Sequence, residues 1–377
     1  MLTQSKTGIG RTAAHDAQND TRMARIIRVL ADNSMLVVSG TKLAIEIGSN
    51  RSEVWRLVQH LRNLGVNIAG HPTEGYRLQT VPDLLLPESI APLVRGTIFD
   101  RHIHHFFTIN STNIVALEAA QGGSPEGSVF LAEEQTAGKG RGGHSWHSEP
   151  STGVYCSVVL RPEMAPVDSL VLSLATGLAA AAAVEEVTGL KPDLRWPNDL
   201  LLVRAPSPDV EGCGTRQSRK FCGVLTELSA EATRVRHVVV GVGINVNHAS
   251  FPEEIEPIAT SLRIETGRTW SRVEVAAALL RALDREYRAL TGRPHVSSAN
   301  VGHQNVDDAR KSIFRRFEEH SSYARGCRVT VEEDNGYSGI TDGLDERGFL
   351  KVRTENGVRT VLHGGVRADQ DADAAKF

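Results

Sequence analysis

The hexapeptide Arg195-Trp196-Pro197-Asn198-Asp199-Leu200 is the most informative stretch of this 377-residue chain. It lies between a long apolar pattern with helical spacing and a short apolar run typical of a strand. Pro197 has no amide hydrogen to give to a sheet, so it predicts a strand edge or a break. Asn198 and Asp199 place an amide and a carboxylate where the chain turns. The stretch therefore predicts polar chemistry at the end of a sheet.

Three other polar or glycine-rich segments accompany the hexapeptide: Asn110–Asn113, Gln135–Trp146 and Gly241–Asn245. The second contains Gly138–Gly143, which formally satisfies the GxGxxG pattern of dinucleotide-binding proteins. That fingerprint requires a helix directly after the glycines, whereas here a polar loop and then a strand follow. We therefore reject a Rossmann fold, and no P-loop sequence is present.

The glycine-rich segment still suits an anionic ligand. Lys139 and Arg141 stand among the glycines. Two cations and exposed backbone N–H groups can surround a phosphate or an acyl phosphate. Taken alone, the segment would more often be an ordinary surface loop.

The bulk composition is that of a globular protein with several domains. Hydrophobic residues make up 40% of the chain and charged residues 23%, with a net charge of −3. The four cysteines are far apart and form no CxxC pair, which argues against a disulfide framework or a zinc site and favours a reducing compartment. The polar first twenty residues show no signal peptide. The most apolar run, Leu170–Val187, contains polar residues and two glutamates, so it predicts a buried helix rather than a membrane span.

The pattern along the chain divides it into five parts. Three helical patterns and a short hairpin between residues 21 and 80 predict a winged helix-turn-helix, and this part carries eight basic and four acidic residues. Prolines then mark a linker, and short β segments with Asn-Gly turns end the chain. The predicted parts are a disordered tail at 1–20, the winged helix-turn-helix at 21–80, a linker at 81–97, a central α+β domain at 98–322 and a small β-barrel at 323–370.

The central part alternates apolar strands with two long helices. Asp168 is predicted to cap a helix that ends near Gly189, and Val273–Leu290 reads as an amphipathic helix. The Pro-, Gly- and Ser-rich stretch Ala205–Ser218 reads as an insertion between two strands. The predicted strands are Val129–Ala132, Val154–Leu160, Leu200–Val203, Phe221–Leu228 and Val235–Val246.

In their order, these segments resemble the biotin–protein ligase family, in its bifunctional form that also represses biotin genes. The resemblance covers residues 22–367 and rests on four motifs: Gly138–Trp146, Trp196–Asp199, Lys220–Glu227 and Gly241–Asn245. It implies an α+β fold with an N-terminal winged helix-turn-helix, a class II synthetase-like biotin/lipoate ligase domain on a mixed sheet, and a C-terminal SH3-like barrel.

The resemblance also implies the chemistry. Biotin would attack ATP to give biotinyl-5′-AMP, and a lysine of the biotin carboxyl carrier protein of acetyl-CoA carboxylase would then displace AMP. Biotin, ATP and Mg²⁺ are the implied ligands. The implied setting is the cytoplasm, with operator DNA and a second copy of the adenylate-bound chain as further partners and no membrane.

The family motifs imply roles for individual residues. Lys220 and Arg141 are the predicted catalytic cations, and no resident metal site is predicted. The nucleotide would contact Trp146, Asn198, Asp199 and Asn245. The predicted biotin-binding residues are Ser111, Thr112, Asn113, Gln135, Lys139, Gly140, Arg141, Lys220, Gly223, Gly241 and Gly243.

The resemblance also places the DNA contacts of the N-terminal part. Arg51, Ser52 and Arg56 would face DNA, and the Gly70–Gly75 turn would form the wing. Alternatively, the unit could serve only in dimerisation or docking, which would leave a ligase without operator binding. Two further readings stay open: a transcription regulator that senses a ligand without ligase activity, and a lipoate ligase or octanoyl transferase.

The chain departs from the family pattern at two places. Arg195 stands where the family usually has lysine before Trp-Pro-Asn-Asp, and a planar fork replaces a point charge there. Lys139, Gly142 and His144 stand where the family loop usually has arginines. Fewer loop cations predict weaker retention of an adenylate.

Overall fold

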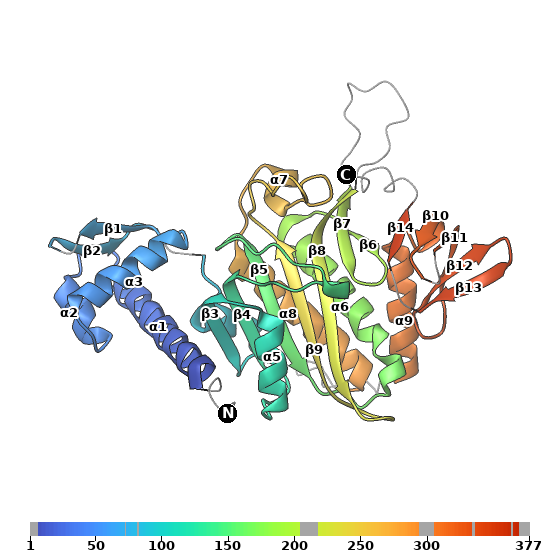
Figure 1. Ribbon diagram of the computed structural model, residues 1–377, viewed down its shortest axis with the longest axis horizontal. Helices are drawn as coiled ribbons and strands as arrows, with labels where there is room; N and C mark the ends of the chain where they lie inside the picture. The colour runs from blue at the N-terminus through green and yellow to red at the C-terminus, as the bar shows by residue number, and fades with distance from the viewer. Residues whose placement is uncertain are drawn as a thin grey trace, which may run out of the picture.

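The computed structural model describes residues 7–71, 73–80, 83–203, 218–293, 305–333, 336–362 and 365–368. Three units follow one another along the long axis of the molecule (Figure 1). A small helical unit lies at one end, a large sheet with its helices lies in the middle, and a second, smaller sheet lies at the other end. The predicted insertion at Ala205–Ser218 falls outside the described residues except for Ser218, which begins a strand.

The N-terminal unit consists of three helices and a hairpin. The helices are α1 (Thr7–Asp32), α2 (Gly40–Glu46) and α3 (Arg51–Asn63), and β1 (Ile68–His71) pairs antiparallel with β2 (Gly75–Leu78). The side chains of Ser39 and Asn50 accept hydrogen bonds from the first turns of α2 and α3, as good N-caps do. The apolar faces of all three helices meet in one core: Ile26, Leu30, Leu43, Val54, Leu57 and Tyr76 are buried there.

Helix α1 corrects the expected disorder of the tail for residues 7–20, and the first six residues lie outside the described part. It begins at Thr7, far ahead of the apolar face formed by Met23, Ile26 and Leu30. Propagating a helix from a packed nucleus adds one hydrogen bond for each residue fixed, and no second nucleation is needed. Polar composition therefore does not end this helix where the packing ends.

The expected linker at 81–97 is folded where it is described. It holds α4 (Pro87–Ile90) and the 3₁₀ turn Ala91–Val94. Leu85, Ile90 and Val94 are fully buried in the central core. Prolines at the starts of these turns lose no intrahelical hydrogen bond, so the Pro-rich composition is compatible with short helical turns.

The central unit is built on a seven-stranded mixed sheet with the order β3-β4-β5-β9-β8-β7-β6. Only β3 and β4 run parallel, and every other neighbouring pair is antiparallel. All five predicted strands are present, with bounds that differ by a few residues. The strands are β3 (Ile103–Ile109), β4 (Val129–Gln135), β5 (Gly153–Leu160), β6 (Asp193–Arg195), β7 (Asp199–Val203), β8 (Ser218–Ala230) and β9 (Val235–Asn245).

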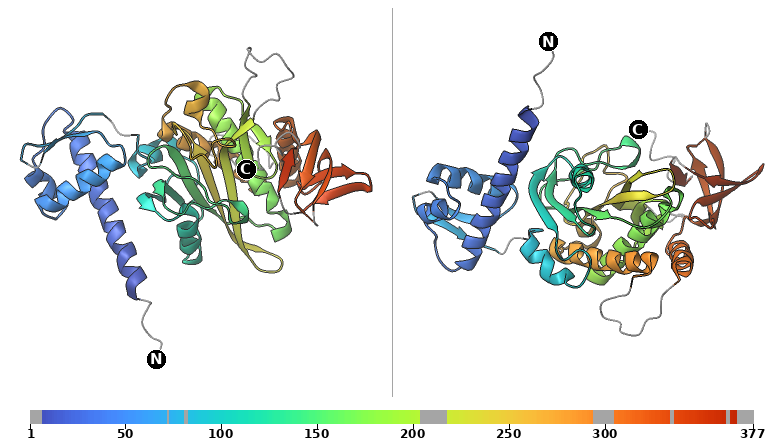
Figure 2. Two further views of the ribbon diagram at one scale, coloured as in Figure 1. Left: turned by 45° about the horizontal axis from the view of Figure 1, so that its top comes forward. Right: turned by 90° about the horizontal axis from the view of Figure 1, so that it is seen from below.

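Helices cover the two faces of this sheet unequally (Figure 2). On β5, Cys156 and Val158 pack into the large core with α6 (Leu170–Thr188) and α8 (Arg272–Thr291), whereas Val159 packs with α5 (Thr112–Gln121) on the opposite face. Because successive strand residues alternate between faces, odd-numbered residues of β5, of β8 from Gly223 onward and of β9 from His237 onward point to the α5 side. The short α5 leaves part of that side uncovered.

Helix α6 has the length and apolar character of a membrane span, but most of that stretch is buried in the core. It begins one residue later than expected: Asp168 belongs to the 3₁₀ turn Pro166–Asp168, and Ser169 holds the N-cap position without a side-chain cap. Gly189 ends the helix in the left-handed conformation, as predicted. The predicted helix Val273–Leu290 is α8.

The C-terminal unit follows α7 (Leu262–Thr266), α8 and α9 (Val306–Glu319). It is a five-stranded antiparallel sheet with the order β13-β12-β11-β10-β14, so β13 and β14 form its edges among the described residues. Gly326 and Gly343 lie inside strands, at register shifts. The strands are β10 (Arg325–Val331), β11 (Tyr337–Leu344), β12 (Leu350–Thr354), β13 (Gly357–Val361) and β14 (Val366–Ala368).

Candidate functional site

A small cavity of about 40 Å³ lies on the α5 side of the central sheet. The N-terminal residues of α5, the glycine-rich segment after β4, and strands β5, β8 and β9 supply its walls. All eleven predicted biotin-binding residues line it, together with Trp146 and Asn198 from the predicted nucleotide set. The sequence therefore predicted which residues gather at one place, although they are spread over more than 130 positions.

A connected set of hydrogen bonds fixes the polar wall of the cavity. The Asn113 amide donates to Glu227 Oε2 at 2.7 Å and accepts from the Ser157 hydroxyl at 2.7 Å. The backbone N–H of Thr112 donates to Gln135 Oε1 at 2.9 Å. Because each amide has one orientation that satisfies its partners, these side chains present fixed donors and acceptors to a ligand.

Two facing glycines carry the indole of Trp146. Gly223 on β8 pairs with Gly243 on β9. A methyl group added at Gly243 would lie 2.5 Å from Trp146 Cε2, and one added at Gly223 would lie 2.9 Å from Trp146 Cζ3. Only glycine leaves room for the ring at both positions. We expected the biotin ring over these glycines, but in this structure the protein's own tryptophan lies there.

Gly241, the third predicted glycine, is likewise covered by a side chain of the protein. A methyl group added there would lie 2.2 Å from Asn113 Oδ1. The missing side chain therefore makes room for the Asn113 amide, which belongs to the polar wall of the cavity.

Three cationic side chains line the cavity, Lys139 and the two predicted catalytic cations Lys220 and Arg141. Lys220 Nζ lies 2.6 Å from Asp199 Oδ1 and 5.4 Å from the centre of the Trp146 ring. Desolvation lowers the pKa of the Arg141 guanidinium and the Asp199 charge raises it, and an arginine remains charged at neutral pH in either case. The cavity therefore offers positive charge beside neutral hydrogen-bonding groups.

The Trp-Pro-Asn-Asp segment forms the turn between β6 and β7, with a cis peptide bond before Pro197. Asn198 Nδ2 donates to the carbonyl of Val224 at 3.0 Å, which holds this turn against β8. Trp196 Nε1 donates to the carbonyl of Gly348 at 2.9 Å, which joins the turn to the C-terminal unit. The segment thus supports the cavity and connects two units.

A second, larger cavity of about 300 Å³ shares Arg141, Asn198, Val224 and Leu225 with the first. It extends along the start of α6 to Phe349 and Leu362 of the C-terminal unit. The two hollows therefore have a common wall that contains one cation and one amide.

Comparison with known proteins assigns the chain to a family. Residues 106–245 match the model of the biotin/lipoate A/B protein ligase family. The chain is 30% identical over 334 residues to the bifunctional ligase/repressor BirA of Bacillus subtilis, covering 87% of this chain and 93% of that one. It is 34% identical over 259 residues to the biotin–[acetyl-CoA-carboxylase] ligase of Mycobacterium tuberculosis, covering 67% and 82%. The chain belongs to the biotin protein ligase family.

A solved structure agrees with this biotin protein ligase assignment. The chain resembles the biotin protein ligase from Aquifex aeolicus in complex with biotin and ATP, with a TM-score of 0.56 and 28% identity. The match covers 71% of this chain and all of that one. The remaining part of this chain therefore has no counterpart in the Aquifex protein.

Two of the predicted nucleotide-binding residues, Asp199 and Asn245, do not line the first cavity. Asp199 reaches it through its ion pair with Lys220. Asn245, at the end of β9, donates from Nδ2 to the carbonyl of Thr260 at 3.1 Å, and its buried Oδ1 has no hydrogen-bond partner in the described part of the chain. Arg195, the departure from the family pattern, is also absent from both cavity walls, and its guanidinium lies 4.4 Å from the centre of the Tyr323 ring.

From the sequence alone we gave no role to three side chains that hydrogen-bond to the residues of the polar wall. They are Ser157, Glu227 and Ser148, whose hydroxyl accepts from Gln135 Nε2 at 2.9 Å. Ser157 gave a usable signal, since it is the one serine in a strand made otherwise of apolar and aromatic residues, glycine and cysteine. Ser148 gave none, because polar residues are ordinary in a loop.

The predicted DNA-contacting residues lie on one exposed side of α3. Arg51 and Ser52 are exposed, and so is Arg56. The Arg56 guanidinium donates to both carboxylate oxygens of Glu53, at 2.9 and 2.7 Å, and this hydrogen bonding raises its pKa. The charge of Arg56 is therefore already partly neutralised within the helix.

Proposed function

We propose that this chain is a biotin–[acetyl-CoA-carboxylase] ligase that works in the cytoplasm. The observation that carries the proposal is the convergence of all eleven predicted biotin-binding residues on one cavity in a chain of this family. In the first step, a carboxylate oxygen of biotin attacks the α-phosphorus of ATP, and the bond to the β-phosphate oxygen breaks to release pyrophosphate. In the second step, a carrier lysine amine attacks the mixed anhydride, AMP leaves, and the amine loses a proton.

The polar wall suits the ureido ring of biotin. That ring is uncharged and needs both donors and acceptors, and fixed amide and hydroxyl groups such as those of Asn113, Thr112 and Gln135 supply them without a charge that would have to be desolvated. The buried Ser157 hydroxyl and the half-buried Glu227 carboxylate keep the Asn113 amide in one orientation.

The cations suit the reaction centre. Attack of a carboxylate on a polyanion brings negative charges together, so fixed positive groups stabilise the transition state more than the separated reactants. Lys220 would neutralise the carboxylate and the α-phosphate, and Arg141, at the wall between the two cavities, would cover the acyl phosphate. Because Trp146 fills the glycine surface, its indole would have to lift when ligand enters and would then close over it.

Mg²⁺ fits the oxygen groups at the predicted nucleotide site. Asp199 offers a carboxylate, and Asn245 Oδ1 is a buried oxygen without a partner in the described part of the chain. Hard oxygen donors of this kind are what Mg²⁺ prefers. When bound, the ion would spread the negative charge of the phosphates.

The test uses the purified full chain with biotin, ATP, Mg²⁺ and an apo biotin-carrier domain, followed by the mass of the carrier. We expect a mass gain of one biotin, and a fall of at least about 100-fold in the initial rate for Lys220→Ala, since removing one stabilising group from such a centre costs about 10²–10³-fold. Lys311→Ala, which removes an exposed lysine on α9, is the matched control and should keep the full rate. No gain with folded wild-type protein, or a gain with lipoate in place of biotin, would overturn the proposal.

The N-terminal unit supports a second function, binding of operator DNA. The bifunctional ligase/repressors of Bacillus subtilis and Escherichia coli are matched over 93% and 98% of their own length, which includes their N-terminal parts. We propose that the unit is a winged helix-turn-helix with α3 as recognition helix, and that the adenylate-bound chain binds as a dimer. Anisotropy of labelled DNA from upstream of the chain's own biotin genes should rise with protein and biotinyl-AMP. It should rise less for Arg51→Ala, whereas equal binding to unrelated DNA would refute operator recognition.

A further inference from the structure

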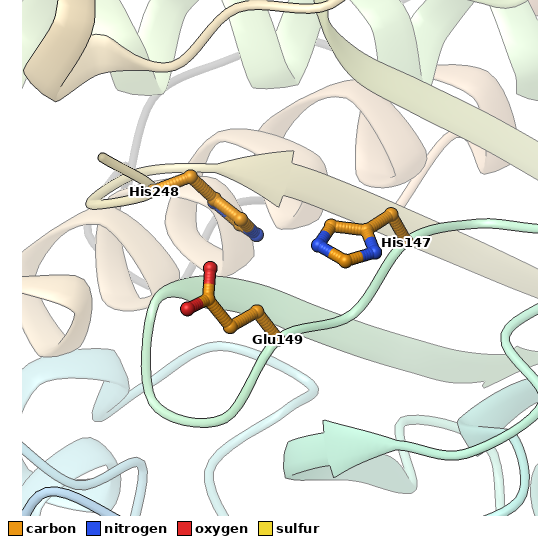
Figure 3. Close-up of side chains that lie close together, drawn as sticks. All are labelled: His147, Glu149 and His248. Carbon is orange, nitrogen blue, oxygen red and sulfur yellow. The ribbon is translucent and has the colours of Figure 1, made fainter. Parts of the chain in front are cut away.

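Two histidines and one glutamate form a second group of polar side chains, and one of the histidines directly follows Trp146 in the sequence (Figure 3). His147 and Glu149 stand in the loop before β5, and His248 stands three residues after β9 ends. One nitrogen or oxygen atom from each of these side chains lies within 4.8 Å of the other two. Figure 3 shows the three side chains converging from two separate segments.

The surroundings of His248 settle which of its nitrogens carries a lone pair. His248 is fully buried, and its ring stacks on Phe251 at a centroid distance of 5.1 Å. The Tyr155 hydroxyl donates its single hydrogen to the backbone carbonyl of Glu149 at 2.9 Å and also lies 3.3 Å from His248 Nε2. The hydrogen of that second contact must therefore come from Nε2, which leaves the lone pair on Nδ1.

The lone pair on His248 Nδ1 accepts no hydrogen bond within the described part of the chain. The atom itself is buried. A buried polar group left in this state costs about 1–3 kcal/mol. Within the same described residues, no hydrogen bond or ion pair engages the His147 ring or the Glu149 carboxylate. His147 and Glu149 thus offer uncommitted electron pairs within 4.8 Å of a nitrogen of the buried His248.

We propose that His147, Glu149 and His248 bind one divalent transition-metal ion, and that Zn²⁺ is the ion that fits best. Two imidazoles and one carboxylate form a donor set suited to Zn²⁺, whereas Mg²⁺ prefers oxygen ligands alone. The site is therefore separate from the Mg²⁺ that accompanies ATP. It does not depend on the proposed ligase activity.

The geometry requires a small closure. Zn²⁺ with ligands at about 2.0–2.1 Å in a tetrahedron holds neighbouring ligand atoms about 3.3 Å apart, so the widest gap here would close by about 1.5 Å. His147 and Glu149 lie in a loop and are not held by hydrogen bonds from their side chains, so rotation of these side chains can supply that movement. Water would occupy the fourth position.

The position of the site gives it a mechanical consequence. The metal would fasten the residue that directly follows Trp146 to the segment after β9, the strand that bears Gly241 and Gly243. It would thereby fix the chain next to the indole that fills the cavity. The sequence predicted no metal here, because the two histidines are separated by a hundred residues and follow no known ligand spacing.

The test measures Zn²⁺ binding to the full chain after treatment with a chelator, by competition with a coloured chelator of known affinity. The absorption spectrum of the Co²⁺-substituted protein reports the coordination geometry. The test variants are His147→Ala and Glu149→Gln, and His144→Ala removes an exposed histidine of the same loop as the matched control. We expect one tight Zn²⁺ per chain and a tetrahedral Co²⁺ spectrum for wild type and for the control, and at least tenfold weaker binding for both test variants.

Three results would overturn the proposal. These are the absence of a stoichiometric tight site in the wild type, an equal affinity for His147→Ala and His144→Ala, and a Co²⁺ spectrum typical of six oxygen ligands. His248→Ala adds a fourth comparison if circular dichroism shows that it folds. Both test variants change loop side chains, so the conclusion does not depend on that buried substitution.

Discussion

Replacing Glu133 with glutamine should weaken the fold by a pH-dependent amount. Glu133 lies on β4 and is fully buried. Its Oε1 accepts hydrogen bonds from Leu85 N–H at 2.8 Å and from His105 Nε2 at 2.9 Å, and its Oε2 lies 2.8 Å from the Arg272 guanidinium. Burial alone would raise the pKa of this carboxyl, but Arg272 and His105, followed by the Leu85 N–H, lower it from 4.5 to about 2.

The size of the effect follows from this pKa. A difference of about 2.5 units between the unfolded and folded states corresponds to about 3 kcal/mol of stability. Because the folded pKa is the lower one, this contribution is fully present above pH 4.5 and is lost as the pH falls toward 2. About 2 kcal/mol of it should be gone at pH 3. Glu133→Gln should therefore cost about 3 kcal/mol at pH 7, within the range for removing one partner of a buried ion pair.

The assay is urea unfolding of both proteins at pH 7, 5, 4 and 3. The difference in the free energy of unfolding between wild type and Glu133→Gln should stay constant down to about pH 5 and shrink below it. Glu134→Gln is the matched control: it changes the neighbouring carboxylate, which accepts from the Thr108 hydroxyl at 3.0 Å and takes no part in the buried network. A cost below about 1 kcal/mol at pH 7, or a cost that does not change with pH, would refute the reasoning.

Two further substitutions test the cavity itself. Gly243→Ala should push the Trp146 indole off the sheet, because the new methyl group would lie 2.5 Å from the ring; acrylamide should quench Trp146 fluorescence more strongly, measured against a Trp146→Phe background, and unchanged quenching would contradict the packing. Asn113→Ala should weaken biotin binding at least tenfold in calorimetry, because Glu227 and Ser157 lose a common partner and the fixed amide is gone. An unaltered dissociation constant would remove Asn113 from the binding site.

The sequence predicted the central sheet well because its signals are local. Strand β9 contains the run Val238–Ile244, made only of apolar residues and glycines, and α8 repeats apolar residues at helical spacing, so each element is visible in its own ten to twenty residues. The cavity residues were predicted through family motifs whose spacing is kept. Both the apolar patterns and the motifs can be recognised in short, continuous stretches of the sequence.

Contacts between distant segments were not predictable in this way. Glu133 meets Leu85, His105 and Arg272, which are separated from it by 28 to 139 positions, and none of these residues forms a motif with another. Residues 81–97 were predicted to be a linker for the same reason. Their apolar side chains are recognised as core residues only when the distant core that they pack against is known. Composition reports what a segment contains, whereas burial depends on what lies opposite.

The glycines of the cavity show the limit most sharply. A glycine at 223 or 243 within a family motif suggests that a side chain there would obstruct something, and from the sequence we took the ligand to be the obstructed group. The structure fills that space with Trp146 instead. Both statements hold if ligand and indole use the same surface in turn, since a flat ring of either kind needs the same bare backbone. The glycine pair therefore leaves room for any flat ring. Only the neighbouring positive charges of Lys220 and Arg141 indicate that the ligand beside this surface carries a carboxylate or a phosphate.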